Sequence, residues 1–480
     1  MIKHCLCAAV LLLAQSFSGL ASESQVNPPP RLPDPSEEGF SPLFNGRDLD
    51  GWTIMGDPKG WKVQDEKIVS DVGFIGGWLR TNRVYGDFIL RLQWRVSPGG
   101  NSGVFVRATT TGNPWISGCE IQITNHPRDS LHCTGSLYGI VPVNPRPDET
   151  PEVWHDFEIH CHGPMYKVYV DNVPVIDVDA RQVPALFARP MRGFIGLQDS
   201  HAANGWIEFR NVRVKELPPM PSDRPDWPLA LQAWTFNHLS LYETIAMCKS
   251  LGIEYLEAYP RQKLSPEHPD IRFDANCPPE HLAATKQVLR EAGVRLVNFG
   301  VTGMDSDETK LRQLFDFALT MGIETINTEP MFAELPLIDK LSKEYDIKVA
   351  IHNHPRREDR PDYRNWDPSF IMEMVQSYNP RIGACADTGH WARSNIKPVE
   401  ALRILKGRII SLHMKDLDKF DPAGVDVPWG TGVCDFEGML EELKRQDFKG
   451  VITIEYENKS GDQVANVKKC IEAFHRFVKP

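Results

Sequence analysis

The sequence predicts two folded domains, an all-β sandwich followed by a (β/α)8 barrel. The chain has 480 residues, which is longer than a chain that usually folds around a single hydrophobic core. Residues 40–217 contain short runs of alternating apolar and polar residues, whereas residues 229–480 repeat a strand pattern followed by an amphipathic helix pattern. Residues 218–228 are rich in proline, which fixes φ and removes a backbone donor. We therefore predict a linker there.

The first residues predict export. Lys3 precedes an apolar run over residues 5–14, and residues 19–22 are small enough for a signal peptidase. We interpret residues 1–22 as a signal peptide that is cleaved after about Ala21. The apolar run is too short to span a membrane. We expect a periplasmic or secreted protein with no membrane insertion after signal cleavage.

The acidic composition argues against a nucleic-acid partner. The chain has 64 acidic and 53 basic residues, a formal net charge of −11. Proteins that bind DNA or RNA usually present a basic surface. A neutral small-molecule carbohydrate is a better candidate for the substrate.

The cysteines do not predict a metal knuckle or a disulfide framework. Eight follow the signal peptide, with no CxxC spacing among them, at positions 119, 133, 161, 248, 277, 385, 434 and 470. We expect most of them to be buried free thiols, although Cys119 and Cys133 could pair.

The sandwich is predicted from strands of period two. Residues 23–39 are rich in proline and serine and are expected to form a flexible leader, so folded structure should begin at residue 40. The pattern favours a sandwich of the jelly-roll or lectin type. The expected strands are residues 87–96, 102–106, 119–124, 156–161, 166–170, 193–197 and 206–214.

One of these strands carries a polar pair on a single face. Alternation puts Glu120 and Gln122 on one face and two isoleucines on the other. The pair could line a sugar groove together with Asn101, Arg107, Tyr138 and Trp154. Alternation alone equally allows these to be solvated, outward positions of a sandwich.

Several motifs in this region resemble the 3-keto-disaccharide hydrolase domain, a concanavalin-like β-sandwich. The resemblance covers about residues 38–216 and implies a groove that acts on oxidised glycosides. It implies Glu120, Gln122, Asn101 and Arg107 as contacts without deciding which of them does the chemistry, and we take Glu120 as the candidate catalytic residue. The motifs are residues 40–52 (FSPLFNGRDLDGW), 100–107 (GNSGVFVR), 119–122 (CEIQ), 135–139 (GSLYG) and 209–212 (FRNV).

The barrel is predicted from eight strand and helix units. Glycines at 252, 293 and 322 follow helix patterns and are expected to be C-caps that lead into the next strand. The functional face should then be the opposite end of the strands. A last helix is expected at about 462–478. The expected strands are residues 229–235, 253–258, 294–300, 323–328, 347–352, 382–387, 409–414 and 450–456.

Side chains that can bind a metal ion lie at the ends of the last three predicted strands. Asp387, His413 and Glu455 end strands six, seven and eight, and the ends of barrel strands converge on one pocket. Mixed nitrogen and oxygen donors without thiolate suit a divalent ion such as Mn²⁺, Mg²⁺, Co²⁺ or Zn²⁺. His390 follows Asp387 by three residues and is expected to contact substrate.

These residues resemble the sugar phosphate isomerase/epimerase superfamily, the xylose isomerase-like TIM barrels, over about residues 229–478. Its epimerases carry Glu, Asp, His and Glu on strands five to eight, so Asp387, His413 and Glu455 match as ligands. Strand five carries His352 in place of Glu and resembles the dehydratase-like members, which have a His-x-His motif. The resemblance implies Glu329, after strand four, as fourth ligand. His352 and His354 would face the substrate as candidate bases, and His352 as a direct ligand stays open.

Three further side chains have two interpretations each. Lys415 could stabilise an oxyanion or pair with Asp416. Trp234, after strand one, could stack on a sugar or plug the barrel. Glu257, after strand two, could touch substrate, although a place on the surface rim is the simpler expectation.

Together the two halves predict cleavage of 3-keto-glycosides. A carbonyl at C3 acidifies the proton at C2, so metal-assisted proton abstraction and β-elimination in the barrel would release the aglycone. The sandwich would hydrate or bind the intermediate. The alternative is an isomerase or epimerase barrel with a non-catalytic carbohydrate-binding sandwich. No glycine-rich dinucleotide motif is present, so a separate 3-dehydrogenase must supply the keto-sugar upstream.

Overall fold

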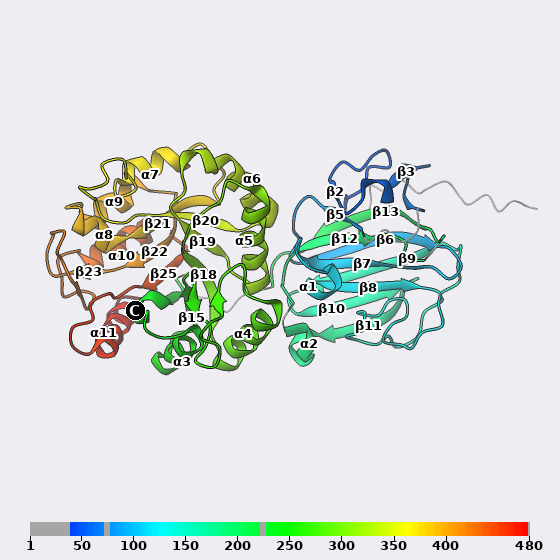
Figure 1. The fold of residues 1–480 in the computed structure, drawn as a ribbon, viewed down its shortest axis with the longest axis horizontal. Helices are drawn as coiled ribbons and strands as arrows, with labels where there is room; N and C mark the ends of the chain where they lie inside the picture. Colours follow the sequence, from blue (N-terminus) through cyan, green and yellow to red (C-terminus); the bar gives the residue numbers. More distant parts are fainter. Residues whose placement is uncertain (1–38, 72–76, 188, 203, 221–226, 479–480) are drawn as a thin grey trace, which may run out of the picture.

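The computed structural model describes residues 39–71, 77–187, 189–202, 204–220 and 227–478. The predicted signal peptide, nearly all of the predicted leader and most of the predicted linker lie outside these residues. Two lobes follow one another along the chain, the sandwich at right and the barrel at left in Figure 1.

The first lobe is a sandwich of two antiparallel sheets, as predicted. The larger sheet runs in the order β11 (Val173–Asp179), β10 (Met165–Val170), β9 (His155–His162), β6 (Phe88–Val96), β13 (Ile207–Glu216), β4 (Lys67–Ser70) and β3 (Lys62–Gln64), with β1 (Ser41–Pro42) paired to β13. The smaller sheet runs β2 (Trp52–Met55), β5 (Trp78–Thr81), β12 (Phe194–Gln198), β7 (Asn101–Ala108) and β8 (Cys119–Thr124). Short helices α1 (Pro114–Ser117) and α2 (Pro184–Phe187) lie at the end nearest the barrel in Figure 1.

The core of the sandwich follows from the alternation. Along β6, Phe88, Leu90, Leu92, Trp94 and Val96 are buried while the residues between them are partly exposed. The same alternation on β8 turns two isoleucines into the core, so the side chains between them leave it on the outer face of the smaller sheet.

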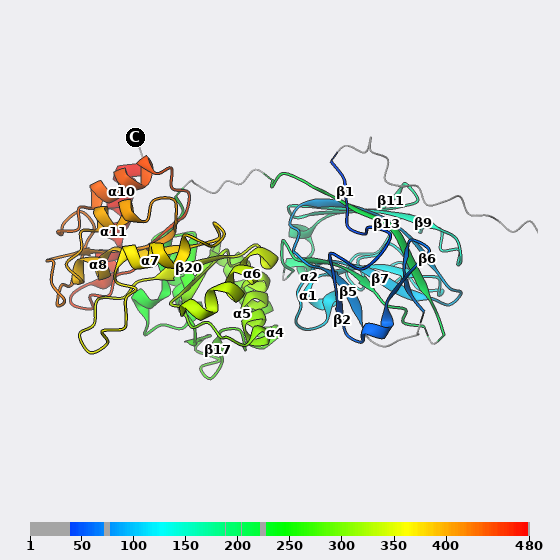
Figure 2. The same ribbon diagram turned by 90° about the horizontal axis from the view of Figure 1, so that it is seen from above.

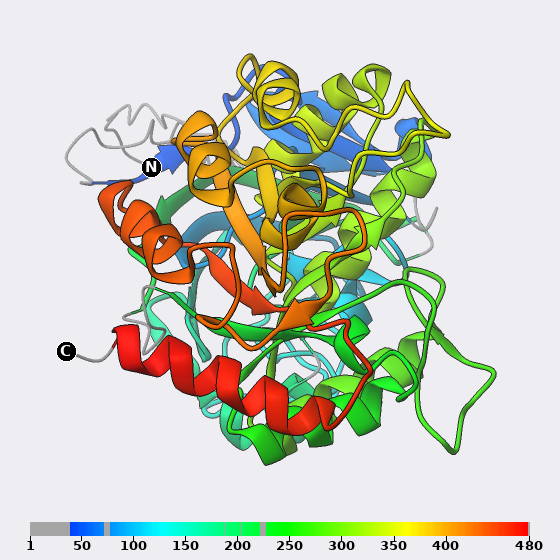
Figure 3. The ribbon, with the colours of Figure 1, turned by 90° about the vertical axis from the view of Figure 1, so that its left-hand side faces the viewer.

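The second lobe is a closed barrel of eight parallel strands, as predicted. Its strands are β14 (Leu229–Gln232), β15 (Tyr255–Ala258), β18 (Arg295–Thr302), β19 (Thr325–Thr328), β20 (Lys348–His352), β21 (Ile382–Asp387), β22 (Ile409–Met414) and β25 (Val451–Ile454). Figure 3 views the molecule from the side of this lobe. Its helices are α3 (Leu241–Leu251), α4 (Pro279–Ala292), α5 (Glu308–Met321), α6 (Leu335–Tyr345), α7 (Pro368–Val375), α8 (Thr388–Arg393), α9 (Pro398–Ile404), α10 (Phe436–Arg445) and α11 (Gln463–Val478). Short pairs β16 (Gln262–Lys263) with β17 (Arg272–Phe273), and β23 (Asp416–Leu417) with β24 (Asp426–Val427), lie in loops.

Three helix ends orient the barrel. Helices α3, α4 and α5 each end at a glycine with positive φ, and Gly252 has a φ of 69° and donates its N–H to the last turn of α3. The glycine C-caps predicted from sequence are therefore confirmed. They place the carboxyl ends of the strands at the opposite, functional end.

The two lobes meet where helices α5 and α6 face the sandwich (Figures 1 and 2). The Arg80 guanidinium lies 2.9 Å from the Glu344 carboxylate, and both side chains are nearly buried. Asp316 of α5 accepts hydrogen bonds from Thr110 of the sandwich. A cleft of about 830 Å³ opens beside these contacts and is lined by residues of both lobes.

Two absences concern the described residues only. No helix among them is both long enough and apolar enough to cross a membrane. Cys119 and Cys133 are buried free thiols, so the disulfide that the sequence allowed is not formed.

Candidate active site

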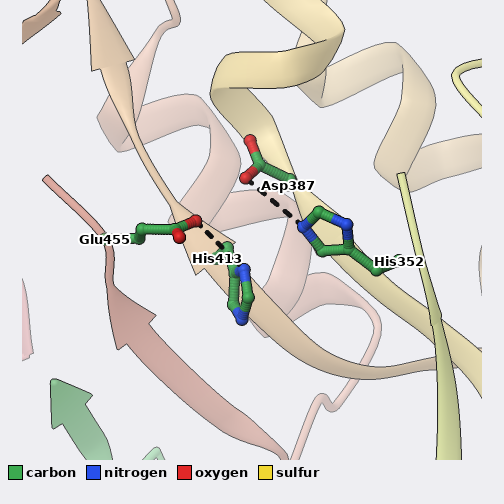
Figure 4. Close-up of side chains that lie close together, drawn as sticks. All are labelled: His352, Asp387, His413 and Glu455. Carbon is green, nitrogen blue, oxygen red and sulfur yellow. Dashed lines mark ion pairs between the residues drawn. The ribbon is translucent and has the colours of Figure 1, made fainter. Parts of the chain in front are cut away.

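Four buried side chains gather at the carboxyl ends of consecutive barrel strands (Figure 4). His352 ends β20, Asp387 ends β21, His413 lies near the end of β22 and Glu455 follows β25. One ligand atom from each lies within 4.8 Å of those of the other three. The three residues carried over from the epimerase pattern are thus brought together, with His352 as the fourth member.

The polar atoms of this group suit a bound cation. His352 Nε2, Asp387 Oδ2 and His413 Nδ1 are buried and make no hydrogen bond of good geometry. Charged neighbours are nevertheless close, because His352 Nε2 lies 3.6 Å from Asp387 Oδ2 and His413 Nδ1 lies 3.1 Å from Glu455 Oε2. Buried polar atoms without hydrogen bonds are costly, and converging imidazole and carboxylate donors fit a divalent metal. We name these four residues the metal group.

Glu329 does not belong to the metal group. Its Oε1 lies 2.5 Å from His354 Nδ1, 3.3 Å from His352 Nδ1 and 2.8 Å from the Tyr363 hydroxyl, which donates to it. Because Glu329 contacts Nδ1 of His352, the Nε2 of that ring is left to face Asp387. The geometry therefore favours the alternative, His352 as fourth ligand, although Glu329, His352 and His354 also form a possible ligand group.

His352 lies between two carboxylates. Burial opposes the charge on its ring, but the nearby carboxylates of Asp387 and Glu329 outweigh burial and raise the pKa of His352 to about 9. A ring held in this way is a poor general base near neutral pH. His354 is the better candidate, since its side chain is 34% exposed and its Nδ1 contacts Glu329.

Lys415 lies among the carboxylates of the site. Its Nζ lies 3.0 Å from Asp387 Oδ2, 2.9 Å from Glu455 Oε2 and 2.8 Å from Glu457 Oε2, and its side chain is fully buried. Burial opposes its charge, but Asp387 and Glu455 hold the pKa of Lys415 well above its usual value. The alternative pairing with Asp416 is not formed, because that carboxylate accepts backbone N–H groups of the following loop. Lys415 therefore brings a fixed positive charge to the metal group.

His390 and Trp234 lie at the same end of the barrel. His390 Nε2 is 3.5 Å from Asp387 Oδ2, and its ring stacks on His354 at 5.1 Å. Burial lowers the pKa of His390 well below its usual value. Trp234 is 43% exposed and meets the Tyr259 ring edge-on. A side chain so exposed does not plug the barrel.

Sequence reasoning missed the role of Glu257, which it placed at the rim. The carboxylate is completely buried and receives five hydrogen-bond donors. One is His413 Nε2, 2.7 Å from Glu257 Oε1. The others come from Gln232, Asn298, Asn327 and Thr453. Glu257 lies one residue before the end of strand β15, close to where the predicted ligands lie on their strands, and that position was the available signal.

A second polar group lies on the outer face of the smaller sandwich sheet. Glu120 is 5% exposed, and burial raises its pKa to about 8 although a hydrogen bond with Gln198 lowers it. A Cβ atom on Gly103 would collide with the Glu120 carboxyl, which explains glycine in the GNSGVFVR motif. Gln122 donates to Asn101 at 2.8 Å. We name Glu120, Gln122, Asn101 and Gln198 the sandwich group, of which Gln198 was not predicted.

Tyr138 lies beside this group, since its backbone N–H donates to the Glu120 carbonyl at 2.9 Å. Arg107 does not face a groove. Its side chain is fully buried and donates to the carbonyls of Gly86 and Gly163, so it joins strands inside the domain. Trp154 stacks with Arg95 and Arg210 of the other sheet. Of the six predicted residues, two therefore lie elsewhere, Arg107 and Trp154. The four that lie together are Glu120, Gln122, Asn101 and Tyr138.

Comparisons with known proteins match both lobes. Residues 39–215 match the family model described as 3-keto-alpha-glucoside-1,2-lyase-like domain, and residues 245–476 match the model described as xylose isomerase-like TIM barrel.

Similar proteins include a 3-keto-disaccharide hydrolase from Bacteroides thetaiotaomicron, 28% identical over 232 residues, which are 38% of this chain and 79% of that protein. An uncharacterized protein from Parabacteroides distasonis has a solved structure that is 32% identical and covers 52% of this chain and 99% of its own, with a TM-score of 0.44. A xylose isomerase domain protein from Planctomyces limnophilus is 18% identical and covers 53% of this chain and 98% of its own, with a TM-score of 0.40. The chain thus joins a 3-keto-disaccharide hydrolase-like domain to a xylose isomerase-like TIM barrel.

Proposed function

We propose that the protein is an exported enzyme that cleaves 3-keto-glycosides such as 3-keto-disaccharides. The observation that carries this proposal is the metal group beside the His354–Glu329 pair. The name of the B. thetaiotaomicron relative supports the substrate class for the sandwich lobe. A separate 3-dehydrogenase would supply the keto-sugar.

His354 is the proposed base. In the reacting tautomer Glu329 accepts Nδ1–H of His354, so Nε2 carries the lone pair that accepts a proton. Tyr363 donates to the same Glu329 oxygen and accepts from the His354 backbone N–H, so it holds both residues in place. The pair thereby supplies an oriented imidazole at the mouth of the barrel.

The reaction proceeds through an enolate. His354 takes the proton from C2 of the sugar, and the C–H electron pair moves toward the C3 carbonyl oxygen. The electrons then return to form the C1=C2 bond as the C1–O bond breaks. The aglycone leaves with that electron pair and is protonated to the alcohol. No pair of carboxylates with glycosidase spacing is needed.

The charge that develops on the C3 oxygen requires positive groups nearby. A divalent ion held by His352, Asp387, His413 and Glu455 would supply Lewis-acid stabilisation of that oxygen. Lys415 adds a fixed ammonium group that needs no reorganisation during the reaction.

The sandwich group would act on the unsaturated product. Glu120, with its pKa of about 8, is protonated near neutral pH and can donate a proton to C2 while water adds at C1. Addition across the double bond yields the free 3-keto-sugar. The amides of Gln122 and Gln198 and the side chain of Asn101 would orient the sugar hydroxyls.

The second candidate is a barrel that isomerises or epimerises free keto-sugars, with a sandwich that only binds carbohydrate. The match of the barrel to the xylose isomerase-like family favours it, since both reactions share the enediolate. Incubation with 3-keto-trehalose and product analysis by mass spectrometry and NMR separates the two. Release of free glucose supports cleavage. Absence of release from 3-keto-trehalose, together with a new isomer formed from free 3-keto-glucose, contradicts it and supports the second candidate.

A further inference from the structure

The exposed apolar side chains of the barrel gather at its functional end. Seven large apolar side chains are exposed among the described barrel residues, and five of them lie on loops that follow strands. Single exposed apolar residues are common on proteins, but a concentration at one end of a barrel indicates a binding surface. The five are Trp234, Met331, Phe332, Val425 and Val433.

Three of the five are connected to the catalytic residues through short stretches of chain. Trp234 lies two residues after Gln232. The Gln232 side chain donates a hydrogen bond to Glu257, which is also hydrogen-bonded to His413. Met331 and Phe332 follow Glu329, which contacts His352 at the end of β20 and His354 in the loop after it. These side chains therefore lie at the same end of the barrel as the metal group.

The mouth has two chemically different halves. The metal group and Lys415 come from β20, β21, β22 and β25, on one side of the barrel. The apolar side chains come mainly from the loops after β14 and β19, on the other side. Two aromatic pairs hold these side chains, Trp234 with Tyr259 at 5.1 Å and Phe332 with Phe370 of the neighbouring helix α7 at 5.5 Å.

The half of the mouth with the metal group and Lys415 would hold the keto group and C2 of the sugar ring. The C1 substituent of the sugar must then point toward the other, apolar half. In the apolar half, Met331 and Phe332 are 64% and 46% exposed. These side chains offer no hydrogen-bond partner to the many hydroxyl groups of a second sugar. An apolar ring, in contrast, would bury these side chains and its own surface at once.

We infer that the half of the mouth formed by Trp234, Tyr259, Met331 and Phe332 is a subsite for an apolar, ring-bearing aglycone. The barrel would then prefer glycosides of such alcohols to disaccharides. This inference rests on the proposed cleavage of 3-keto-glycosides.

The test compares two substrates whose leaving groups are chemically alike. Ethyl and 2-phenylethyl 3-keto-glucosides, in both anomeric forms, release primary alcohols of similar acidity and differ in a phenyl ring. Burying that ring predicts a kcat/KM on the order of tenfold higher for the phenylethyl compound in the full chain. In the W234A/F332A variant this ratio should fall to about 2 or less, because the contacts are removed.

The matched control is I404A. Ile404 is 43% exposed on α9, outside the strand-following loops, and its removal should leave the ratio unchanged. Equal kcat/KM values in the natural chain, or an unchanged ratio in W234A/F332A, would overturn the inference.

Failure of the proposed function is distinguishable from failure of the subsite. If neither glycoside is cleaved, the proposed function fails, and calorimetric titration with the unoxidised ethyl and 2-phenylethyl glucosides decides the subsite. Tighter binding of the phenylethyl compound that W234A/F332A abolishes supports it. Equal binding of the two compounds, or tighter binding that survives the substitutions, overturns it.

Discussion

Glu257 Oε1 lies 2.7 Å from His413 Nε2, on the side of the imidazole opposite to the metal group. The carboxylate thereby holds the Nε2 proton and leaves Nδ1 of His413 directed at Glu455. A second carboxylate behind a ligand histidine fixes the ring and its tautomer.

Replacing Glu257 with Gln should weaken metal binding by about 10- to 100-fold. The amide of E257Q would turn an N–H group toward donors that have no other acceptor there, so we also expect a loss of about 1 to 3 kcal/mol in the free energy of unfolding. Titration of the full chain with Mn²⁺ or Zn²⁺ and thermal unfolding measure the two effects. E254Q is the matched control, since Glu254 is an exposed carboxylate three residues away. Equal affinity in E257Q and E254Q would contradict the positioning role.

Replacing His354 with Asn should lower the rate of C2 proton exchange by about 10²- to 10⁴-fold, because the base is lost. Metal binding should change little, since His354 is not in the metal group. Exchange of the C2 proton measured by NMR in D₂O checks the first effect and metal titration the second. H475N replaces an exposed histidine of α11 and should behave as the natural chain. Full exchange in H354N would remove His354 as the base.

The raised pKa of Glu120 predicts that the stability of the folded protein depends on pH. Its pKa is about 8 in the folded protein against 4.5 for an ordinary glutamate, because the carboxyl is buried. Between these two values the folded state holds a proton that the unfolded state has lost, so stability falls as pH rises from 4.5 to 8. The loss amounts to up to about 4 kcal/mol.

E120Q carries no titrating group at this position and should lose less stability over the same range. Its advantage over the natural chain should grow as pH rises toward 8 and level off above that. Denaturant unfolding of both proteins at pH 5, 7 and 9 gives the comparison. Parallel pH profiles for the two proteins would show that Glu120 is not held protonated by the fold.

The contact between the two lobes should be sensitive to the loss of one charge. Arg80 and Glu344 are 5% and 9% exposed at the side chain, so R80M leaves a largely buried carboxylate with Arg312 as its remaining partner. We expect R80M to lower the free energy of unfolding by about 3 kcal/mol. The exposed pair of Lys62 and Asp71 is the control, and K62M should cost less than about 1 kcal/mol. Scanning calorimetry measures both, and equal effects would contradict a buried ionic contact between the lobes.

The fold could be predicted because its signals are local. Alternation along residues 87–96 and the helix-ending glycines at 252, 293 and 322 determine strand and helix without knowledge of distant residues. The first barrel strand shows the limit. Predicted as residues 229–235, it ends at Gln232, whose side chain accepts from the Trp234 N–H and begins a short 3-10 helix instead.

The site was only partly predictable because its decisive contacts are long-range. Asp387, His413 and Glu455 could be placed together from their positions at strand ends. The choice between Glu329 and His352 depends on which ring nitrogen Glu329 contacts, and spacing along the chain does not contain that information. Arg107 was misplaced for the same reason, since its buried partners Gly86 and Gly163 lie far from it in sequence.

We propose above all that the barrel removes the C2 proton of a 3-keto-glycoside and expels the C1 substituent with the help of a divalent ion. The direct measurement follows 3-keto-trehalose and a 3-keto-glucoside by NMR in D₂O with metal-loaded protein, with and without a chelator. We expect cleavage with deuterium at C2 of the product, and we expect the chelator to abolish it. Cleavage without deuterium at C2, or cleavage that is indifferent to the chelator, would contradict it.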